Sequence, residues 1–229
     1  MKKIAIYVEG GGDRVPQRAA LRVGFDALLD KQKQSARQKN LGWKLVPCGG
    51  RNQTYEAFVD HFQEADPEVL VVLLVDAEDA IAAELPTPKG ETPEAAENRE
   101  LADAEVRKKH LQIREKHWKN VGGASPLQIH LMVRCGEAWI ASDPDTVASY
   151  YGKGFLPKRM PSTVNLEGQS RHDLFDKLKG ASAKTKKGAY EKITHASKLL
   201  QLIITSEVAK LCPRFATFTE WLDDQIAKA

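Results

Sequence analysis

The stretch "EVLVVLLVDAED" at residues 68–79 constrains the fold more than any other part of the chain. Its apolar run covers residues 69–75, which is far too short for a membrane-spanning helix of about 20 residues. A continuous apolar run rich in valine is typical of a strand that is covered on both faces, as in the middle of a parallel sheet. The run therefore predicts a central parallel strand, and a cluster of carboxylates follows directly after it.

Other short apolar runs predict further strands, and amphipathic stretches between them predict helices. Through the first 150 residues strands alternate with helices, and this alternation predicts an α/β protein whose mostly parallel sheet is flanked by helices. The later residues predict a mostly helical C-terminal portion. The further strands are expected at 3–9, 43–48 and 128–134, and the helices at 14–39, 52–65, 98–119, 171–179, 189–211 with a break near Thr205, and 214–229.

A change in composition near residue 153 suggests how the chain is organised. From there to residue 187 the chain is rich in glycine, proline, serine and lysine. We expect an α/β domain over residues 1–152 and a C-terminal extension of helices and loops over residues 153–229, packed on that domain. The alternative is one single domain, because 229 residues lie within the size range of one domain.

The composition is that of a soluble globular protein, with 42% hydrophobic and 28% charged residues. The N-terminal apolar segment Ile4–Val8 ends at Glu9 and is too short for a signal peptide. The cysteines Cys48, Cys135 and Cys212 are far apart and form no CxxC pair, so neither a zinc site nor a disulfide framework is expected. These features favour a cytoplasmic location.

Charge is strongly segregated along the chain. Residues 31–51 contain six bases and no acid, residues 56–105 contain fifteen acids and two bases, and residues 171–198 contain eight bases and three acids. Such segregation suits a protein that holds cations at one place and a polyanion at another. The simpler interpretation is that each run is a solvated helix face.

The stretch "YVEGGGD" at residues 7–13 predicts a sharp turn after the first strand. Its glycines let the backbone approach a substrate closely, and the helix N-terminus that follows favours an anion. We therefore expect substrate contacts from the four residues Gly10, Gly11, Gly12 and Asp13. The GxGxxG and P-loop motifs are both absent. The alternative is a plain strand-to-helix turn that carries an incidental acid.

Carboxylates follow two of the predicted strands. Glu9 comes directly after the first strand, and Asp76, Glu78 and Asp79 come after the third. Ligands of open parallel sheets bind beyond the carboxyl ends of the strands, so these side chains are expected to gather at one edge. Clustered carboxylates repel one another unless a cation lies between them, and oxygen ligands suit Mg²⁺ or Mn²⁺. The sequence therefore predicts a metal site.

This combination resembles the Toprim fold, which topoisomerases, primases and nucleases of the OLD (overcoming lysogenization defect) type share. The resemblance implies that Glu9 is the general acid or base and that Asp76 and Glu78 bind Mg²⁺. Glu78 is a departure, because many Toprim domains have aspartate at the second position of the pair. A glutamate still offers a carboxylate to the metal, but its side chain is one methylene longer.

Further blocks resemble a bacterial Toprim-like family, the domain-of-unknown-function family 4276. They are "HLMVRCGEAWIASDPDTVASYYG" at 130–152, "KGAYEKITHASKLL" at 187–200 and "CPRFATFTEWL" at 212–222. With the two acidic motifs they span nearly the whole chain. Members of this family resemble accessory genes of phage-defence loci, which implies a nuclease that works beside an ATPase of the AAA or ABC type.

Five further residues complete the expected site. Glu137 follows the fourth strand and is expected to join the metal ligands, whereas Asp143 is expected to cap a helix. Lys192 and Lys187 are expected to stabilise the charge of a phosphoryl transition state. The lysines Lys184 and Lys186 are expected to contact a nucleic-acid backbone. For each lysine the alternative is an ordinary solvated side chain.

Together these features predict a metal-dependent phosphoryl-transfer enzyme, a nuclease acting on DNA or RNA in phage defence with an ATPase partner. One alternative is a non-catalytic sensor or regulatory subunit of an ATPase complex, in which the acids serve stability. The other alternative is a small-molecule phosphatase, which the modest net charge of +3 keeps open, because nucleic-acid-binding domains are often more basic.

Overall fold

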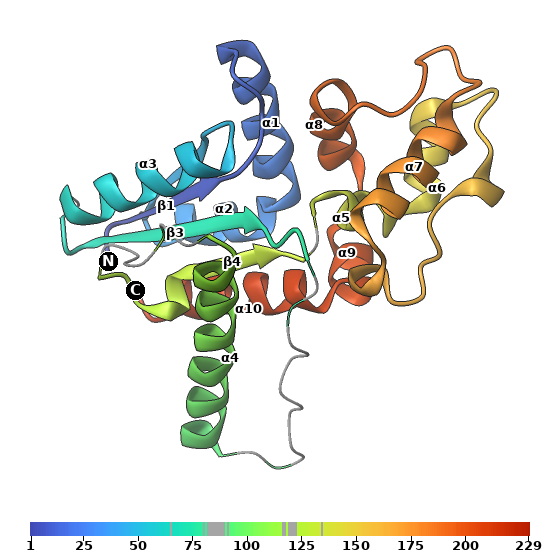
Figure 1. The fold of residues 1–229 in the computed structure, drawn as a ribbon. Coiled ribbons are helices and arrows are strands. Elements are labelled where there is room, and N and C mark those ends of the chain that lie inside the picture. The colour runs from blue at the N-terminus through green and yellow to red at the C-terminus, as the bar shows by residue number, and fades with distance from the viewer. Residues whose placement is uncertain are drawn as a thin grey trace.

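The structure is a computed structural model that describes residues 1–64, 66–79, 81, 90, 92–115, 118, 123–133 and 135–229. Within these ranges no helix has both the length and the apolar character needed to cross a bilayer. The fold is α/β, as predicted, and its sheet is parallel throughout (Figure 1). The strands are β1 (Lys3–Val8), β2 (Gly42–Pro47), β3 (Val69–Asp76) and β4 (Ile129–Met132).

The order of the strands places a crevice at the middle of the sheet. The order is β2-β1-β3-β4, so the chain moves outward from β1 to β2 and then returns past β1 to form β3 on its other side. The direction of winding therefore reverses between β1 and β3. Ligands of open α/β sheets bind at such a switch point, beyond the carboxyl ends of the strands. Glu9 and Asp76 lie at the ends of these two strands.

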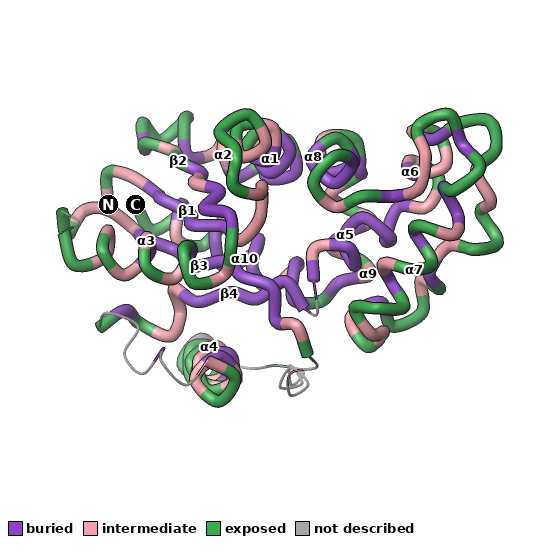
Figure 2. The backbone as a smooth tube through the Cα atoms, turned by 45° about the horizontal axis from the view of Figure 1, so that its top comes forward, coloured by how far each residue is buried: buried purple, intermediate pink, exposed green. Residues whose placement is uncertain are grey.

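Helices cover both faces of the sheet, which explains why the central strands are apolar on every side (Figure 2). The α1, α2 and α10 helices pack on one face, and α3 and α4 pack on the other. The helices are α1 (Val15–Leu28), α2 (Asp30–Gln38), α3 (Arg51–Glu64), α4 (Pro93–Arg114), α5 (Glu137–Ala141), α6 (Pro144–Tyr151), α7 (Arg171–Ser182), α8 (Lys192–Leu202), α9 (Thr205–Leu211) and α10 (Pro213–Ala227), with short 3₁₀ turns η1 (Pro126–Gln128), η2 (Pro157–Arg159) and η3 (Leu166–Gly168).

Helices α5–α9 lie beyond the carboxyl edge of the sheet, and α10 then returns beneath β4 (Figure 1). Apolar side chains of this portion join the same core as the strands, so that Phe215 and Leu199 belong to one cluster with Ile4. The C-terminal portion is helical, as predicted. The division of the chain at residue 152 stays a prediction.

Two predicted helices differ from the structure. The helix expected over residues 14–39 is interrupted at Leu29, whose ψ of 25° directs the chain out of the first helix before α2 begins. The helix expected over residues 98–119 begins earlier, at Pro93, and ends at Arg114. Thr92 caps its start, because its side chain accepts a hydrogen bond from the Ala95 amide. The loop predicted before it lies partly outside the described residues.

Several predictions about single residues are confirmed. Asp143 caps α6 by accepting a hydrogen bond from the Thr146 amide at 3.1 Å, and its other oxygen accepts one from the Ile204 amide at 2.9 Å. The break predicted near Thr205 separates α8 from α9. The aromatic side chains predicted to be core anchors are buried, namely Trp139, Phe215, Phe218 and Trp221.

The α1 and α8 helices cross unusually closely, and Gly24 allows this approach. A Cβ atom added to Gly24 would lie 2.7 Å from the Ser197 carbonyl oxygen of α8. Gly180 in α7 offers the opposite case, because a Cβ there would meet only the Arg159 side chain at an ordinary 3.9 Å.

We expect alanine to have opposite effects at these two helical glycines. Gly180→Ala should raise the free energy of unfolding by about 0.5–1 kcal/mol, because alanine loses less backbone entropy on folding. Gly24→Ala should lower it, because overpacking costs about 1–3 kcal/mol and exceeds that gain. Urea denaturation of the two variants measures both signs. A stabilised Gly24→Ala variant would contradict the close helix crossing.

Candidate metal centre

Three carboxylates from two neighbouring strand ends form a cluster. One carboxylate oxygen from each of Glu9, Asp76 and Glu78 lies within 4.8 Å of the others. Glu9 follows β1, Asp76 ends β3, and Glu78 comes two residues later, where its φ of 67° turns the chain in the left-handed region. The structure therefore brings together the acids that the sequence predicted, at the switch point of the sheet.

Main-chain hydrogen bonds fix the orientation of two of these carboxylates. The Asp76 amide donates to Glu9 Oε2 at 3.0 Å, and the Gly136 amide donates to Asp76 Oδ1 at 3.0 Å. The Glu9 carboxylate thus accepts the hydrogen bond from the last amide of β3. The Asp76 carboxylate accepts one from the loop after β4. Glu9 Oε1 receives no hydrogen bond from a described residue, so it is free to contact a ligand or a proton.

Each of the three carboxylates has a basic partner. Lys192 Nζ lies 2.8 Å from Asp76 Oδ2, and Arg51 Nη1 lies 3.3 Å from Glu9 Oε2. Glu78 forms an ion pair with Arg171. These cations come from the starts of α8, α3 and α7, so helices far apart in the sequence compensate the charge of the cluster.

The pKa of Glu9 depends on its burial and on the charges around it. Burial, and then repulsion from Asp76, raise the pKa of Glu9 to about 7, although Arg51 and Lys192 act in the opposite direction. Burial is the larger of the two causes, and the charge of Asp76 adds to it. A group with a pKa near neutrality can both take up and release a proton at physiological pH.

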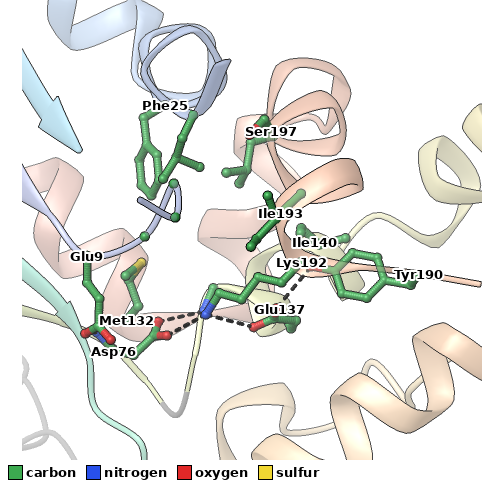
Figure 3. Close-up of a pocket in the computed structure, with 17 residues that line it drawn as sticks. Glu9, Phe25, Asp76, Met132, Glu137, Ile140, Tyr190, Lys192, Ile193 and Ser197 are labelled. Carbon is green, nitrogen blue, oxygen red and sulfur yellow. Dashed lines mark hydrogen bonds and ion pairs between the residues drawn. The ribbon is translucent and has the colours of Figure 1, made fainter. Parts of the chain in front are cut away.

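Lys192 stays charged in this surrounding. Burial alone would lower its pKa, but the Asp76 and Glu137 carboxylates outweigh burial and raise the pKa above its usual value. The ammonium group lies between these two acids, at 2.8 Å and 3.7 Å (Figure 3). The sequence-based prediction placed Lys192 at the site, and the structure brings it there.

Glu137 lies on the far side of Lys192 from the three-carboxylate cluster. It is buried at the start of α5, and Tyr190 donates a hydroxyl hydrogen bond to its Oε1 at 3.0 Å. Burial and the Glu137 charge raise the pKa of Tyr190 well above its usual value, so this donor stays protonated. The role of Glu137 as a metal ligand stays a prediction, because its described contacts are with Lys192 and Tyr190.

The glycine turn at residues 10–12 lies next to the carboxylate cluster. Its amides differ in whether they already donate a hydrogen bond to a described residue. The Gly10 amide donates to the Gly49 carbonyl at 2.7 Å, so it is not available to an anion. The amides of Gly11 and Gly12 donate to no described residue, and both glycines have positive φ values of 88° and 63°. Asp13 is exposed and lies outside the carboxylate cluster.

The start of α1 offers less to an anion than the sequence suggested. The Arg14 amide donates to the Gln17 side chain, and the amides of Gln17 and Arg18 donate to the Arg14 carbonyl. Pro16 has no amide hydrogen. The amides that remain near the cluster are therefore those of the glycine turn rather than those of the helix.

The predicted basic residues are distributed unevenly around the cluster. Lys184, Lys186 and Lys187 are exposed in the loop between α7 and α8, and Lys187 Nζ lies 4.9 Å from the Tyr150 ring centroid. None of them forms an ion pair with a described acid. In the 31–51 run, Lys31 and Lys33 pair with Asp223 and Asp26, two acids outside the cluster.

Several functional residues were missed or misjudged from the sequence. Arg51 and Arg171 contact the cluster but were predicted only as members of basic runs. Arg51 follows β2 closely, so the rule that found Glu9 and Asp76 at strand ends identifies it too. From the sequence alone, His195 is predicted to lie at the surface of its helix, and the structure shows that this prediction is wrong. His195 is buried, and its Nδ1 lies 3.0 Å from the Tyr151 hydroxyl.

Two neighbouring groups have ordinary structural roles. Asp79 pairs with Arg114 on α4 and is not part of the cluster, so it serves as a reference acid close to the site. Burial, and then the Glu137 and Asp76 charges, raise the pKa of the Cys135 thiol above its usual value. A protonated, buried thiol is a poor nucleophile.

The donor set fits a hard divalent cation. Three carboxylates converge, one of them has a raised pKa because of its neighbour, and no soft ligand takes part. Carboxylates of this kind at the switch point of a parallel sheet, with basic side chains around them, define an α/β protein with a candidate metal and phosphate site.

The chain belongs to the family described as Domain of unknown function (DUF4276), whose model matches residues 8–223. The match confirms the family predicted from the sequence blocks and covers both the carboxylate cluster and its basic partners. Comparison with curated proteins and with solved structures finds no match.

The raised pKa of Glu9 predicts a pH-dependent stability. The folded state favours protonated Glu9, so this residue lowers stability progressively as pH rises from about 4.5 through about 7. We expect Glu9→Gln to raise the Tm of the metal-free protein above pH 7 and to leave it unchanged below about pH 4.5. Thermal melts in EDTA measure this.

The exposed Glu56 of α3 provides the matched control for that measurement. Glu56→Gln should shift the Tm equally little at every pH. A stabilisation by Glu9→Gln that does not depend on pH would contradict the raised pKa of Glu9.

Proposed function

We propose that the protein is a metal-dependent phosphoryl-transfer enzyme, and specifically a nuclease. The observation that carries the proposal is the convergence of Glu9, Asp76 and Glu78 within 4.8 Å at the switch point of the sheet, with basic side chains around them. Acids alone would hold a cation, and bases alone would hold an anion. Both together suit a reaction in which a metal and a phosphate occupy one site. The placement of the acids also supports the Toprim resemblance.

The residues fit Mg²⁺ or Mn²⁺, with Asp76 and Glu78 as ligands and Glu9 at their side. When bound, the metal would neutralise the charge that develops on the transferred phosphoryl group. The protein holds these ligands on strand ends rather than on a long loop, which keeps their positions defined.

Glu9 is the best placed proton acceptor for an attacking water. Its Oε2 is held by the Asp76 amide, while its Oε1 stays free. Its raised pKa of about 7 matches the requirement that a general base accept a proton near neutral pH. The same carboxyl group, once protonated, can return the proton to a leaving oxygen.

Lys192 and Arg171 supply positive charge for the phosphate oxygens. The Lys192 side chain is 39% exposed and the Arg171 side chain is 50% exposed, so both reach solvent while they pair with the acids. Arg51 is only 13% exposed and donates to the Asp76 carbonyl at 2.6 Å, which suits a positioning role. The loop that precedes α8 carries Lys184, Lys186 and Lys187. We propose that these lysines contact a nucleic-acid backbone.

A second candidate function has a specific observation in its favour. Each of the three carboxylates already has a basic partner from the chain itself, so the cluster is partly compensated without any metal. This arrangement suits a scaffold in which the acids and bases join helices, as in a non-catalytic regulatory subunit. A small-molecule phosphatase has no comparable observation in its favour. An ATPase partner and a role in phage defence stay predictions from the family resemblance.

The nuclease proposal is tested by cleavage of single- and double-stranded DNA and RNA with Mg²⁺, with Mn²⁺ or with EDTA. We expect cleavage that requires metal. Glu9→Gln and Asp76→Asn should each reduce the rate by about 10²–10⁴-fold, because each removes a group that acts on the reacting atoms. Asp79→Asn should keep the rate, because Asp79 pairs with Arg114 outside the cluster. Equal loss in all three variants would contradict the assignment.

Metal binding tests the metal centre without an activity assay. At about 100 times its Kd, Mn²⁺ should stabilise the wild-type protein by about 2.7 kcal/mol, and Asp76→Asn should abolish this effect. Lys192→Met should lower the Tm, because Asp76 and Glu137 stay buried without their cation. A metal centre predicts that Mn²⁺ restores the Tm of Lys192→Met, whereas a purely structural cluster predicts no recovery.

A further inference from the structure

An apolar pocket opens directly beside the carboxylates. It has a volume of about 120 Å³, and it shares Glu9, Asp76 and Glu137 with the site as part of its wall (Figure 3). The rest of its lining comes mainly from the facing surfaces of α1 and α8. The proposed reaction uses the acids at its edge but gives no role to the space itself.

The walls of this pocket are those of a binding site for a flat apolar group. Phe25 of α1, Ile140 of α5 and Ala196 of α8 line its interior and are buried. Ile193 lines it too, but its side chain is 51% exposed, so it forms an apolar rim open to solvent. Apolar side chains with a few polar groups at one end are typical of small-ligand pockets.

The glycine turn forms one side of the pocket, where no side chains project into the space. A Cβ atom on Gly10 would lie 3.1 Å from Leu21 Cδ2, and one on Gly12 would lie 3.5 Å from Ile193 Cδ1, both side chains of the lining. A side chain at Gly10 would therefore crowd Leu21, whereas one at Gly12 would make an ordinary contact with Ile193 and a close one of 2.8 Å with Gln17 Oε1. The same turn presents the unengaged amides of Gly11 and Gly12 next to the carboxylates.

We propose that this pocket binds one unpaired nucleobase of the substrate, next to the phosphate that faces the carboxylates. The inference rests on the proposed function and names its substrate class. The occupant must be joined to the phosphate by a short link, since pocket and cluster share residues, and it must be apolar on its faces, as a base is. An apolar cavity of about 150 Å³ holds one benzene ring, so this pocket of about 120 Å³ admits one six-membered ring and not a base pair.

The inference predicts a preference for single strands or frayed ends. A base inside a duplex must unstack and unpair before it can enter a pocket of this kind. A pocket lined by apolar side chains with few polar groups binds every base by its faces rather than by its edges, so little sequence preference is expected.

Binding tests the pocket without requiring catalysis. Isothermal titration calorimetry with Mn²⁺ present compares cytidine monophosphate, whose base is a single ring, with ribose phosphate, which lacks the base. We expect the nucleotide to bind about tenfold tighter, in keeping with the stacking of one base. Ala196→Phe fills the pocket and should remove that difference while keeping the affinity for ribose phosphate. Ala102→Phe, at an exposed position of α4, is the matched control and should keep the difference.

A second variant guards against a folding defect in Ala196→Phe. Ile193→Ser removes the exposed apolar rim at little risk to the core, and it should weaken nucleotide binding but not ribose phosphate binding. Equal affinities of the wild type for both probes would overturn the inference, and so would a difference that survives in Ala196→Phe. Base-dependent binding without any nucleic-acid cleavage would support the pocket and reject the nuclease. Cleavage without base-dependent binding would support the nuclease and reject the pocket.

Discussion

Repulsion between Glu9 and Asp76 is the constraint on which the rest of this structure depends. The two carboxylates lie at the ends of adjacent parallel strands, and the Asp76 amide holds Glu9 in place by a hydrogen bond. Burial, and then the like charge of Asp76, raise the pKa of Glu9, and the fold supplies positive charge that acts in the opposite direction. The helices around the cluster supply this positive charge.

The positive charge comes from helix starts that converge on one edge. Arg51 begins α3, Arg171 begins α7 and Lys192 begins α8, and each forms an ion pair with an acid of the cluster. Two of these three helices belong to the portion of the chain after residue 152. The C-terminal helices are therefore part of the site itself, because without them Asp76 loses Lys192 and Glu78 loses Arg171, while Glu78 keeps its longer contact of 4.0 Å with Arg51.

One of these helices, α8, also lines the pocket beside the cluster, together with α1. Gly24 lets α1 approach the backbone of α8 closely, and the pocket lies where these two helices face each other near the glycine turn. A charged edge thus adjoins an apolar recess. A phosphate and the base attached to it present the same two kinds of surface, and this correspondence links the proposed reaction with the proposed occupant of the pocket.

The sequence by itself determined the local elements and the acids at the strand ends. The continuous apolar run of β3 specified a buried parallel strand, and a residue just past such a strand must lie at the carboxyl edge, which is why Glu9, Asp76 and Glu78 were found in advance. Only the tertiary structure decided which cations meet these acids, that His195 is buried against Tyr151, and that α1 and α8 together line a pocket beside the carboxylates. Strand-end positions follow from chain direction, whereas these contacts join residues far apart in the sequence and depend on how helices pack, which periodicity and local charge do not encode.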